Sequence, residues 1–150
     1  METRNLNVLI SVATTARDAA AVQRAQAQQQ LDAARTQLET LNGYALDYAR
    51  RARDQLTQGC DRMAQTNARA FSGRLDEAIA AQLQETQRRE KQFEAADAQW
   101  RDLASRVHRL ELLVSRREQA ERESARRHEQ KLTDELARTA VQRRATVADR

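Results

Sequence analysis

Apolar residues in the first third of the chain recur at a seven-residue interval. One column consists of Leu6, Ala13, Ala20, Ala27, Ala34, Leu41 and Tyr48. A companion column has Leu9 and Ala16 early in the chain, and then Leu31, Leu38, Ala45 and Ala52. From residue 31 onward the steps between these positions alternate between three and four without a break. Such a seam predicts a long helix that packs along one partner helix.

A second apolar run with the same spacing follows later in the chain. It comprises Leu75, Ile79, Gln82, Thr86, Arg89, Phe93, Ala96, Trp100, Leu103, Val107, Leu110 and Val114. Its middle is polar. The stretch between the two runs is polar and contains two of the three glycines, which predicts a reversal of the chain. We therefore predict an all-α fold, a long antiparallel two-helix coiled-coil hairpin.

The two runs also match each other in side-chain size. A reversal near residue 62 places residue i opposite about 123 − i, so that Ala13, Ala20 and Ala27 fall near large residues of the second run, as close packing requires. We expect a single coiled-coil domain over residues 1–150. Its predicted parts are arm one (4–57), a turn region (58–68), arm two (69–117) and an unpaired C-terminal extension (118–150).

The predicted extension is polar on all sides and overhangs the first arm. Three pairs at i,i+4 spacing support it as a helix: Glu118–Arg122, Glu123–Arg127 and Asp134–Arg138. A helix without an apolar face bridges solvent or needs a partner. Residues 101–150 hold thirteen Lys/Arg and nine Asp/Glu, so this third of the chain carries the formal net charge of +4.

Composition supports long helices and a cytoplasmic protein. The chain has no proline, only three glycines and 32% charged residues. A lone cysteine, Cys60, forms no internal disulfide and fits a reducing compartment. The short apolar run at Val8–Ile10 predicts neither a signal peptide nor a membrane span, so we expect any membrane association to occur through partners.

No arrangement of residues in the sequence indicates catalysis. His108 and His128 lie far apart among charged residues, and no phosphate-binding loop, metal-ligand spacing or nucleophile motif is present. We expect no enzyme activity, cofactor, metal or small-molecule substrate. The run "SRREQAERESARRHEQK" has interspersed glutamates and no aromatic residue, and only Leu132 and Leu136 follow it, which argues against a nucleic-acid helix.

Four stretches in sequence order resemble the FliJ-type proteins of flagellar type III export and their injectisome counterparts. They are "LNGYALDYARR" (41–51), "ARAFSGRLDEAIAAQ" (68–82), Trp100 with "LASRVHRLELLVSRR" (103–117), and "RRHEQKLTDELA" (126–137). The resemblance implies a small cytosolic stalk shaped like the central rotor stalk of F-type ATP synthase. Such proteins bind the hexameric export ATPase, link it to the membrane export gate at the inner membrane, and bind the escort chaperones of export substrates.

The resemblance also implies two contact surfaces. The export-gate surface maps to Gln37, Leu41, Tyr44, Tyr48, Phe71, Leu75, Ala78 and Gln82. In the heptad frame Gln37, Tyr44, Phe71 and Ala78 are g positions, which should line one edge of the hairpin near its bend, and the other four are d positions. Some relatives have histidine at the position of Gln82. By analogy with the rotor, the ATPase surface falls on basic residues near the C-terminus: Arg116, Arg117, Arg122, Arg126, Arg127 and Lys131.

Several residues of the two contact surfaces also have a simpler structural explanation. Burial in the seam alone explains Leu41, Tyr48 and Leu75, and Phe93 and Trp100 are expected in the hairpin core. The basic residues near the C-terminus also suit a solvated helix with intrahelical ion pairs. Alternative functions are the equivalent stalk of a virulence-type injectisome, a generic dimerising coiled-coil scaffold, and a basic nucleic-acid binder.

Overall fold

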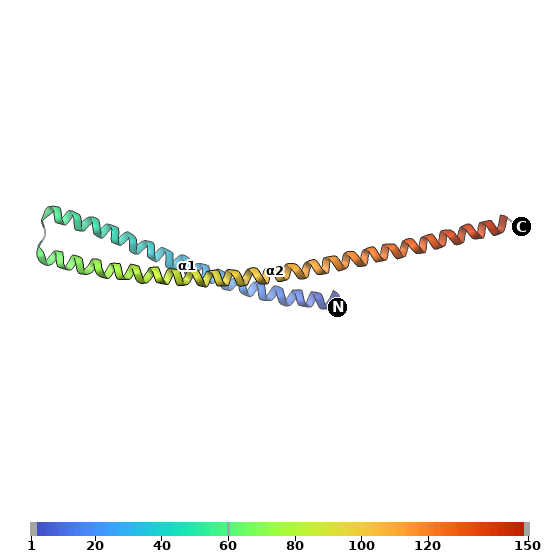
Figure 1. Cartoon of the computed structure of the whole chain (residues 1–150), viewed down its shortest axis with the longest axis horizontal. Helices are drawn as coiled ribbons and strands as arrows, with labels where there is room; N and C mark the ends of the chain where they lie inside the picture. The colour runs from blue at the N-terminus through green and yellow to red at the C-terminus, as the bar shows by residue number, and fades with distance from the viewer. Residues whose placement is uncertain (1–2, 60, 149–150) are drawn as a thin grey trace. The chain divides into compact units, whose positions relative to one another are not determined.

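The computed structural model describes residues 3–59 and 61–148, and these residues form two helices. Helix α1 spans Thr3–Gln58 and helix α2 spans Arg62–Ala148 (Figure 1). The prediction of an all-α fold built from two long packed helices is confirmed. Cys60 lies outside the described residues, so its predicted reduced state stays a prediction.

Contacts group the chain into two compact units. Of the described residues, 15–59 and 61–104 form one, the hairpin unit, and 3–14 with 105–148 form the other, the terminal unit. Both helices contribute to both units. The candidate gate-contact residues all belong to the hairpin unit, and the candidate ATPase-contact residues all belong to the terminal unit.

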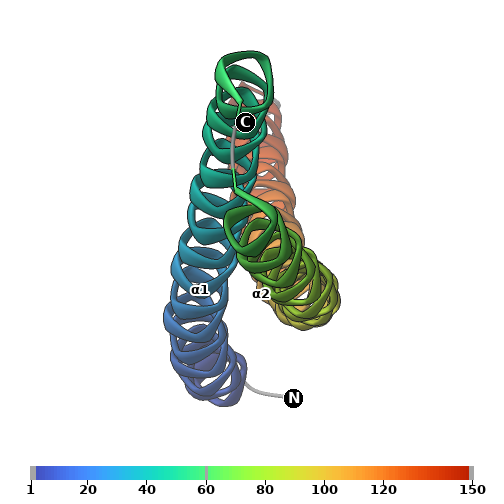
Figure 2. The same cartoon turned by 90° about the vertical axis from the view of Figure 1, so that its left-hand side faces the viewer.

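The two arms of the hairpin unit are antiparallel (Figure 2). Arg35 pairs with Glu90 at 2.7 Å, and nearer the turn the rings of Tyr48 and Phe71 lie 4.6 Å apart. The hydroxyl of Thr86 lies 3.4 Å from the backbone oxygen of Ala34. The Tyr48–Phe71 and Ala34–Thr86 contacts place residue i opposite about 120 − i, slightly offset from the expected register, because the turn lies closer to residue 60 than to residue 62.

The reversal is much shorter than the turn region expected at 58–68. Gly59 ends α1 with φ of 81°, the left-handed conformation that glycine adopts without steric cost. Asp61 precedes α2, and its backbone oxygen accepts a hydrogen bond from the Gln65 N–H at 3.1 Å. The expected turn at 62–68 is wrong, because those residues include no glycine or proline and continue the helix. The hydroxyl of Thr66 donates to the oxygen of Arg62 within the helix.

Small residues facing large ones make the core of the hairpin unit. Leu31 is 1% exposed and Ala20 4% exposed. In the observed register, Ala20 falls opposite Trp100 and Ala27 opposite Phe93, and both aromatic residues are half-buried. The predicted seam of arm two is reproduced, since every residue of it within the hairpin unit is buried or half-buried.

Among the residues of the terminal unit whose burial is described, Leu6, Ala13 and Val107 are the buried apolar ones. Beyond this core, every residue from 118 to 145 is exposed. Helix α2 nevertheless continues through this segment to Ala148. That the segment overhangs the first arm stays a prediction.

The early companion column of α1 differs from expectation. Leu9 and Ala16 are exposed, whereas Ile10, Arg17 and Arg24 are half-buried. The heptad column that passes through Leu31 continues backward to these three residues, and Leu9 and Ala16 lie one residue out of that register. The continuous register of the helix therefore overrides the apolar character of two side chains.

Candidate partner-binding site

Four of the candidate gate-contact residues lie on α1 in two columns. Leu41 and Tyr48 are half-buried in the seam between the arms. Gln37 and Tyr44 are exposed, and Tyr44 leaves 62% of its surface open to solvent. The spacing i, i+4, i+7, i+11 therefore separates the four residues into a seam column and an outer column.

The other four residues, on α2, divide in the same way. Leu75 and Gln82 are half-buried, while Ala78 and Phe71 are exposed, Phe71 by 48%. All four d positions of the candidate set are thus half-buried and all four g positions are exposed. Apolar and aromatic surface on such an outer column is typical of protein contact sites.

Phe71 is held by an aromatic contact across the hairpin. Its ring centroid lies 4.6 Å from that of Tyr48, with an angle of 46° between the ring planes. The seam residue Tyr48 is therefore the ring partner of Phe71. Such a tilted pair fixes the orientation of a partly exposed ring and contributes about 0.5–1.5 kcal/mol. Phe71 is accordingly a preorganised surface residue.

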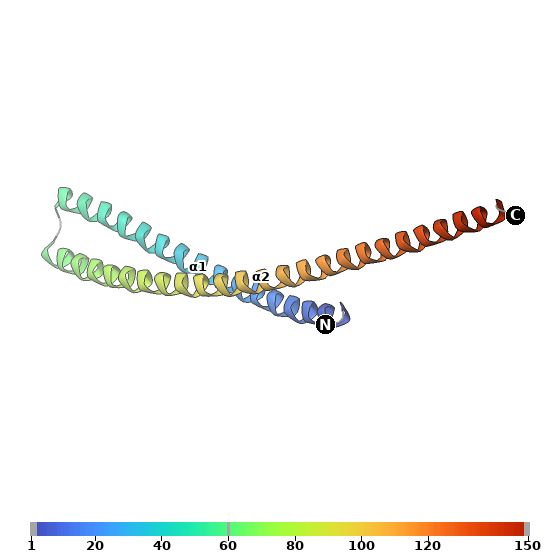
Figure 3. The same cartoon turned by 45° about the vertical axis from the view of Figure 1, so that its right-hand side comes forward.

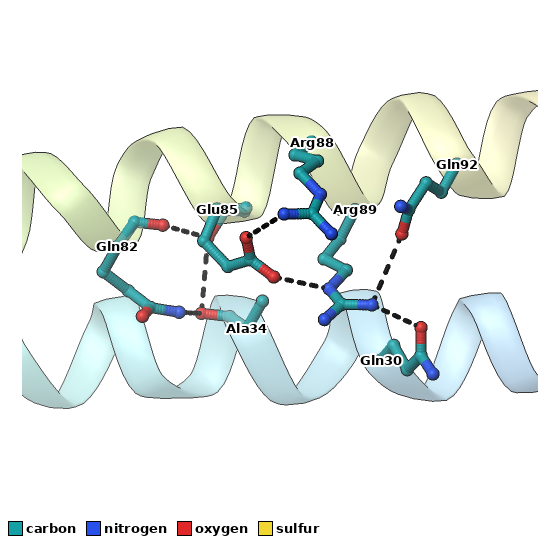
Figure 4. Close-up of polar contacts among 8 residues, drawn as sticks. Gln30, Ala34, Gln82, Glu85, Arg88, Arg89 and Gln92 are labelled. Atoms are coloured by element: carbon teal, nitrogen blue, oxygen red, sulfur yellow. Dashed lines mark hydrogen bonds and ion pairs between the residues drawn. The ribbon is translucent and has the colours of Figure 1, made fainter.

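Gln82 has a defined structural task at the edge of this set (Figure 4). Its side-chain amide donates to the backbone oxygen of Ala34 on α1 at 3.0 Å. The hydroxyl of Thr86, 8% exposed, donates to the backbone oxygen of Gln82 at 2.9 Å. These hydrogen bonds place a satisfied polar layer in the seam, which tolerates two polar side chains because each has an acceptor.

Arg89 extends the polar layer toward solvent. Its guanidinium pairs with Glu85 on the same helix at 2.7 Å and donates to the side-chain oxygen of Gln30 on α1 at 2.6 Å (Figure 4). Arg88 also lies 3.7 Å from Glu85. A polar layer at one level of a two-helix seam favours a single register between the arms.

A second polar contact lies where Arg24 occupies the seam column. Its guanidinium lies 4.8 Å from the ring centroid of Trp100 and 5.8 Å from that of Phe93. Its Nε also donates to Asp97, whose side chain is only 14% exposed. Arg101 binds the second oxygen of Asp97 at 2.8 Å. Arg24 therefore covers both aromatic residues and neutralises a largely buried carboxylate.

The candidate ATPase-contact residues line the exposed part of α2. Arg122 pairs with Glu118 at 3.7 Å and Arg127 with Glu123 at 3.6 Å, which confirms two of the three predicted i,i+4 pairs. The third pair, Asp134–Arg138, is absent from the ion pairs of the described residues. Arg117 is half-buried and has a partner, whereas Arg116, Arg126 and Lys131 are exposed and make no ion pair with the described part of the chain. Two arginines of this part of α2 are thus paired with glutamates of the same helix, whereas Arg116, Arg126 and Lys131 remain able to bind acidic groups of a partner.

The described residues hold no group of three His, Cys, Asp or Glu side chains that could bind a metal ion. Both histidines are exposed. None of the described helical segments is sufficiently long and apolar to span a membrane.

Comparison with protein families matches residues 1–146 to the model of the flagellar FliJ protein. The chain belongs to the FliJ family. No curated protein and no solved structure matched the chain. The match covers α1 and α2 as far as residue 146 and supports the resemblance found in the sequence. FliJ proteins are non-catalytic components of flagellar protein export.

Two features of this FliJ protein are not predicted by its sequence pattern. Arg17 and Arg24 occupy seam positions, but their charge hides them from a search for apolar periodicity. The signal for Arg24 was the seven-residue spacing of Phe93 and Trp100 with Asp97 between them, which can surround one guanidinium. The polar seam layer at Gln82 and Thr86 was visible as a weak point, although its hydrogen bonds to α1 were not.

Proposed function

We propose that this FliJ protein is the stalk of the flagellar export apparatus, coupling the hexameric export ATPase to the membrane export gate and binding escort chaperones. One observation supports the gate contact: four of the eight candidate residues are half-buried in the seam, and the other four form an exposed column beside it. Tyr44 and Phe71 provide large exposed side chains on that outer column. The protein is held at the inner membrane through the gate.

Tyr44 and Phe71 suit the role of anchor residues in this contact. Aromatic residues dominate the energetics of protein interfaces because they bury a large area at small entropic cost. Phe71 is oriented by Tyr48, which reduces the cost of ordering it on binding. Gln37 and Ala78 flank the contact as smaller residues.

The exposed C-terminal part of α2 supports a second contact, with the ATPase. Arg116, Arg126 and Lys131 are exposed and make no ion pair with the described residues. Acidic residues in the ATPase ring would pair with these charges and thereby raise the rate and fix the orientation of association. Escort chaperones are further protein partners in this proposal, and no nucleic acid takes part.

Calorimetric titration into the cytosolic part of the cognate export-gate protein tests the gate contact. We expect the wild-type chain to bind and the double variant Tyr44→Ala/Phe71→Ala to bind at least about tenfold more weakly, since two anchors are lost. Leu46→Ala is the matched control, because Leu46 is 63% exposed on α1 and lies outside the candidate set.

Helicity measured by circular dichroism must be the same in all three proteins. Equal gate binding by the wild type and the double variant would reject the site and leave the family role intact. Absence of binding by the wild type would reject the gate contact itself. A concentration-dependent homodimer in light scattering, without gate binding, would favour the generic scaffold.

A further inference from the structure

The two arms of the hairpin unit leave an open groove beside the turn. It has a volume of about 390 Å³ and is lined from α1 by Ala45, Ala49, Ala52 and Leu56 and from α2 by Ala64 and Ala68, among others. Figures 1 and 3 show the arms diverging toward this end of the hairpin unit. We call this surface the tip groove.

The groove opens because size complementarity between the arms fails there. Farther from the turn, alanine falls opposite a large residue, as with Ala20 and Trp100. Beside the turn, the same register places Ala52 opposite Ala68, so two small side chains face each other. Two alanines cannot fill the space between helix axes that large side chains set elsewhere in the seam.

A second hollow of about 540 Å³ shares part of this lining. Tyr48, Gln55, Ala64 and Ala68 border both hollows, so the space between the arms is reached from two sides. Leu56 at the turn end is 60% exposed. Apolar surface is therefore available along the gap, and its alanines follow the three-four spacing that receives large side chains from another helix.

The segment of chain that forms the tip groove, residues 48–75, is strongly basic. Residues 48–75 contain six arginines and two aspartates, a formal charge of +4 that equals the net charge of the whole chain. The six are all exposed, and none forms an ion pair within the described residues; they are Arg50, Arg51, Arg53, Arg62, Arg69 and Arg74. Arg69 lines the groove itself, as does one acidic residue, Asp76.

We infer that the tip groove binds an acidic amphipathic helix of another protein. Large apolar side chains of that helix enter the gap between Ala52 and Ala68, and its acidic residues pair with Arg69 and the other exposed arginines of this segment. A second copy of this chain does not suit the groove, because its own tip is equally basic and its acidic segment, residues 76–100, already uses its apolar seam within its own hairpin. The tip groove goes beyond the proposed gate contact, although Tyr48 and Leu75 belong to both surfaces.

A designed peptide provides the probe. It is about three heptads long, with leucines along one face and glutamates elsewhere, and carries a fluorophore for anisotropy. A second peptide with the same composition in scrambled order retains the charge but has no apolar face. We expect the wild-type chain to bind the first peptide at least about tenfold more tightly than the second, because only the first can fill the gap.

The decisive variant is Ala52→Leu/Ala68→Leu, which fills the groove from within. We expect it to raise the unfolding temperature of the chain and to weaken peptide binding about tenfold or more, two changes that loss of folding cannot produce together. Ala33→Leu/Ala98→Leu is the matched control, since both alanines are exposed and lie outside the groove.

The contribution of charge is tested separately. Arg51→Gln/Arg69→Gln should weaken peptide binding several-fold. Arg106→Gln/Arg109→Gln removes the same charge from exposed positions of α2 outside the groove, and it should leave binding unchanged.

Several results would overturn the inference. They are equal binding of the two peptides, undiminished binding by the filled variant, and absence of binding by the wild type. Sedimentation of the wild type with anionic vesicles, without peptide binding, would assign the basic tip to a membrane surface. Dimerisation that the filled variant abolishes would assign the groove to a second copy. The assay contains no gate protein, so its failure is distinguishable from failure of the gate contact.

Discussion

Arg24 combines three interactions that a single apolar residue could not supply. It stacks against Trp100 and Phe93, and it neutralises Asp97, whose side chain is 14% exposed. An aliphatic residue at this seam position would pack on the rings but leave the carboxylate with Arg101 as its remaining partner. A charged residue in a seam column is therefore tolerated because its charge is matched and its stem covers apolar surface.

Replacement of Arg24 should destabilise the hairpin measurably. We expect Arg24→Ala to lower the free energy of unfolding by about 1–2 kcal/mol, since cation–π and ion-pair contacts are lost at a half-buried site. Urea unfolding followed by circular dichroism measures this change. Arg17→Ala is the control, because the ion pair of Arg17 is with its sequence neighbour Asp18 and its loss should cost less than about 0.5 kcal/mol. Equal losses in the two variants would contradict the role assigned to Arg24.

Both helices are long because nothing in their sequence stops them except the residues at the turn. The chain lacks proline, and two of its three glycines, Gly43 and Gly73, lie inside helices. Only Gly59 adopts a positive φ among the described glycines. Glycine is therefore needed at one position of this fold, and at the other two it merely weakens the helix.

Alanine substitutions should reveal this difference by their opposite signs. Gly59→Ala should destabilise the protein by about 1 kcal/mol, because an alanine there is held in the left-handed region. Gly73→Ala should stabilise it by up to about 1 kcal/mol, because an added Cβ meets no atom within 4 Å and the helix propensity rises. Thermal unfolding of both variants beside the wild type is the measurement, and a shift of the same sign in both would refute this explanation of the turn.

Positive charge collects in two separate parts of the chain. Residues 48–75 and residues 101–150 each carry a formal charge of +4, whereas the intervening residues 76–100 hold three basic and six acidic side chains. Acidic residues follow the first basic segment closely, so residues 51–100 as a whole have no net charge. Two basic regions separated by an acidic one suit a protein that contacts different partners through different segments.

Removal of the residues after Arg117 should separate the two roles. We expect the truncated chain to retain the hairpin, since the buried residues of the hairpin unit precede the cut, and to lose stimulation of the export ATPase. ATP hydrolysis by the cognate ATPase, with helicity as the control, measures this. A full-length variant with Arg122, Arg126, Arg127 and Lys131 changed to glutamine tests whether charge alone is responsible. Undiminished stimulation by the truncated chain would remove the ATPase contact from this segment.

The spacing of apolar residues predicts much of the hairpin. The columns from Leu31 to Ala52 and from Leu75 to Val114 match the observed burial. Prediction failed where neighbouring frames were both possible, as at Leu9 and Ile10, because apolar character alone does not distinguish two columns one residue apart. It failed again at the turn, because a polar composition after Gly59 suits an exposed helix as well as a loop.

The sequence by itself determined the helices, the antiparallel seam and membership in the FliJ family, since these depend on periodicity and on residues that recur in order along the chain. The tertiary structure alone decided the register between the arms, the stacking of Arg24 on Trp100, the pairing of Tyr48 with Phe71 and the tip groove. Each of these depends on which residues of two separate segments come to lie opposite each other. A shift of a few residues in the position of the turn changes every such pair while leaving each helix intact.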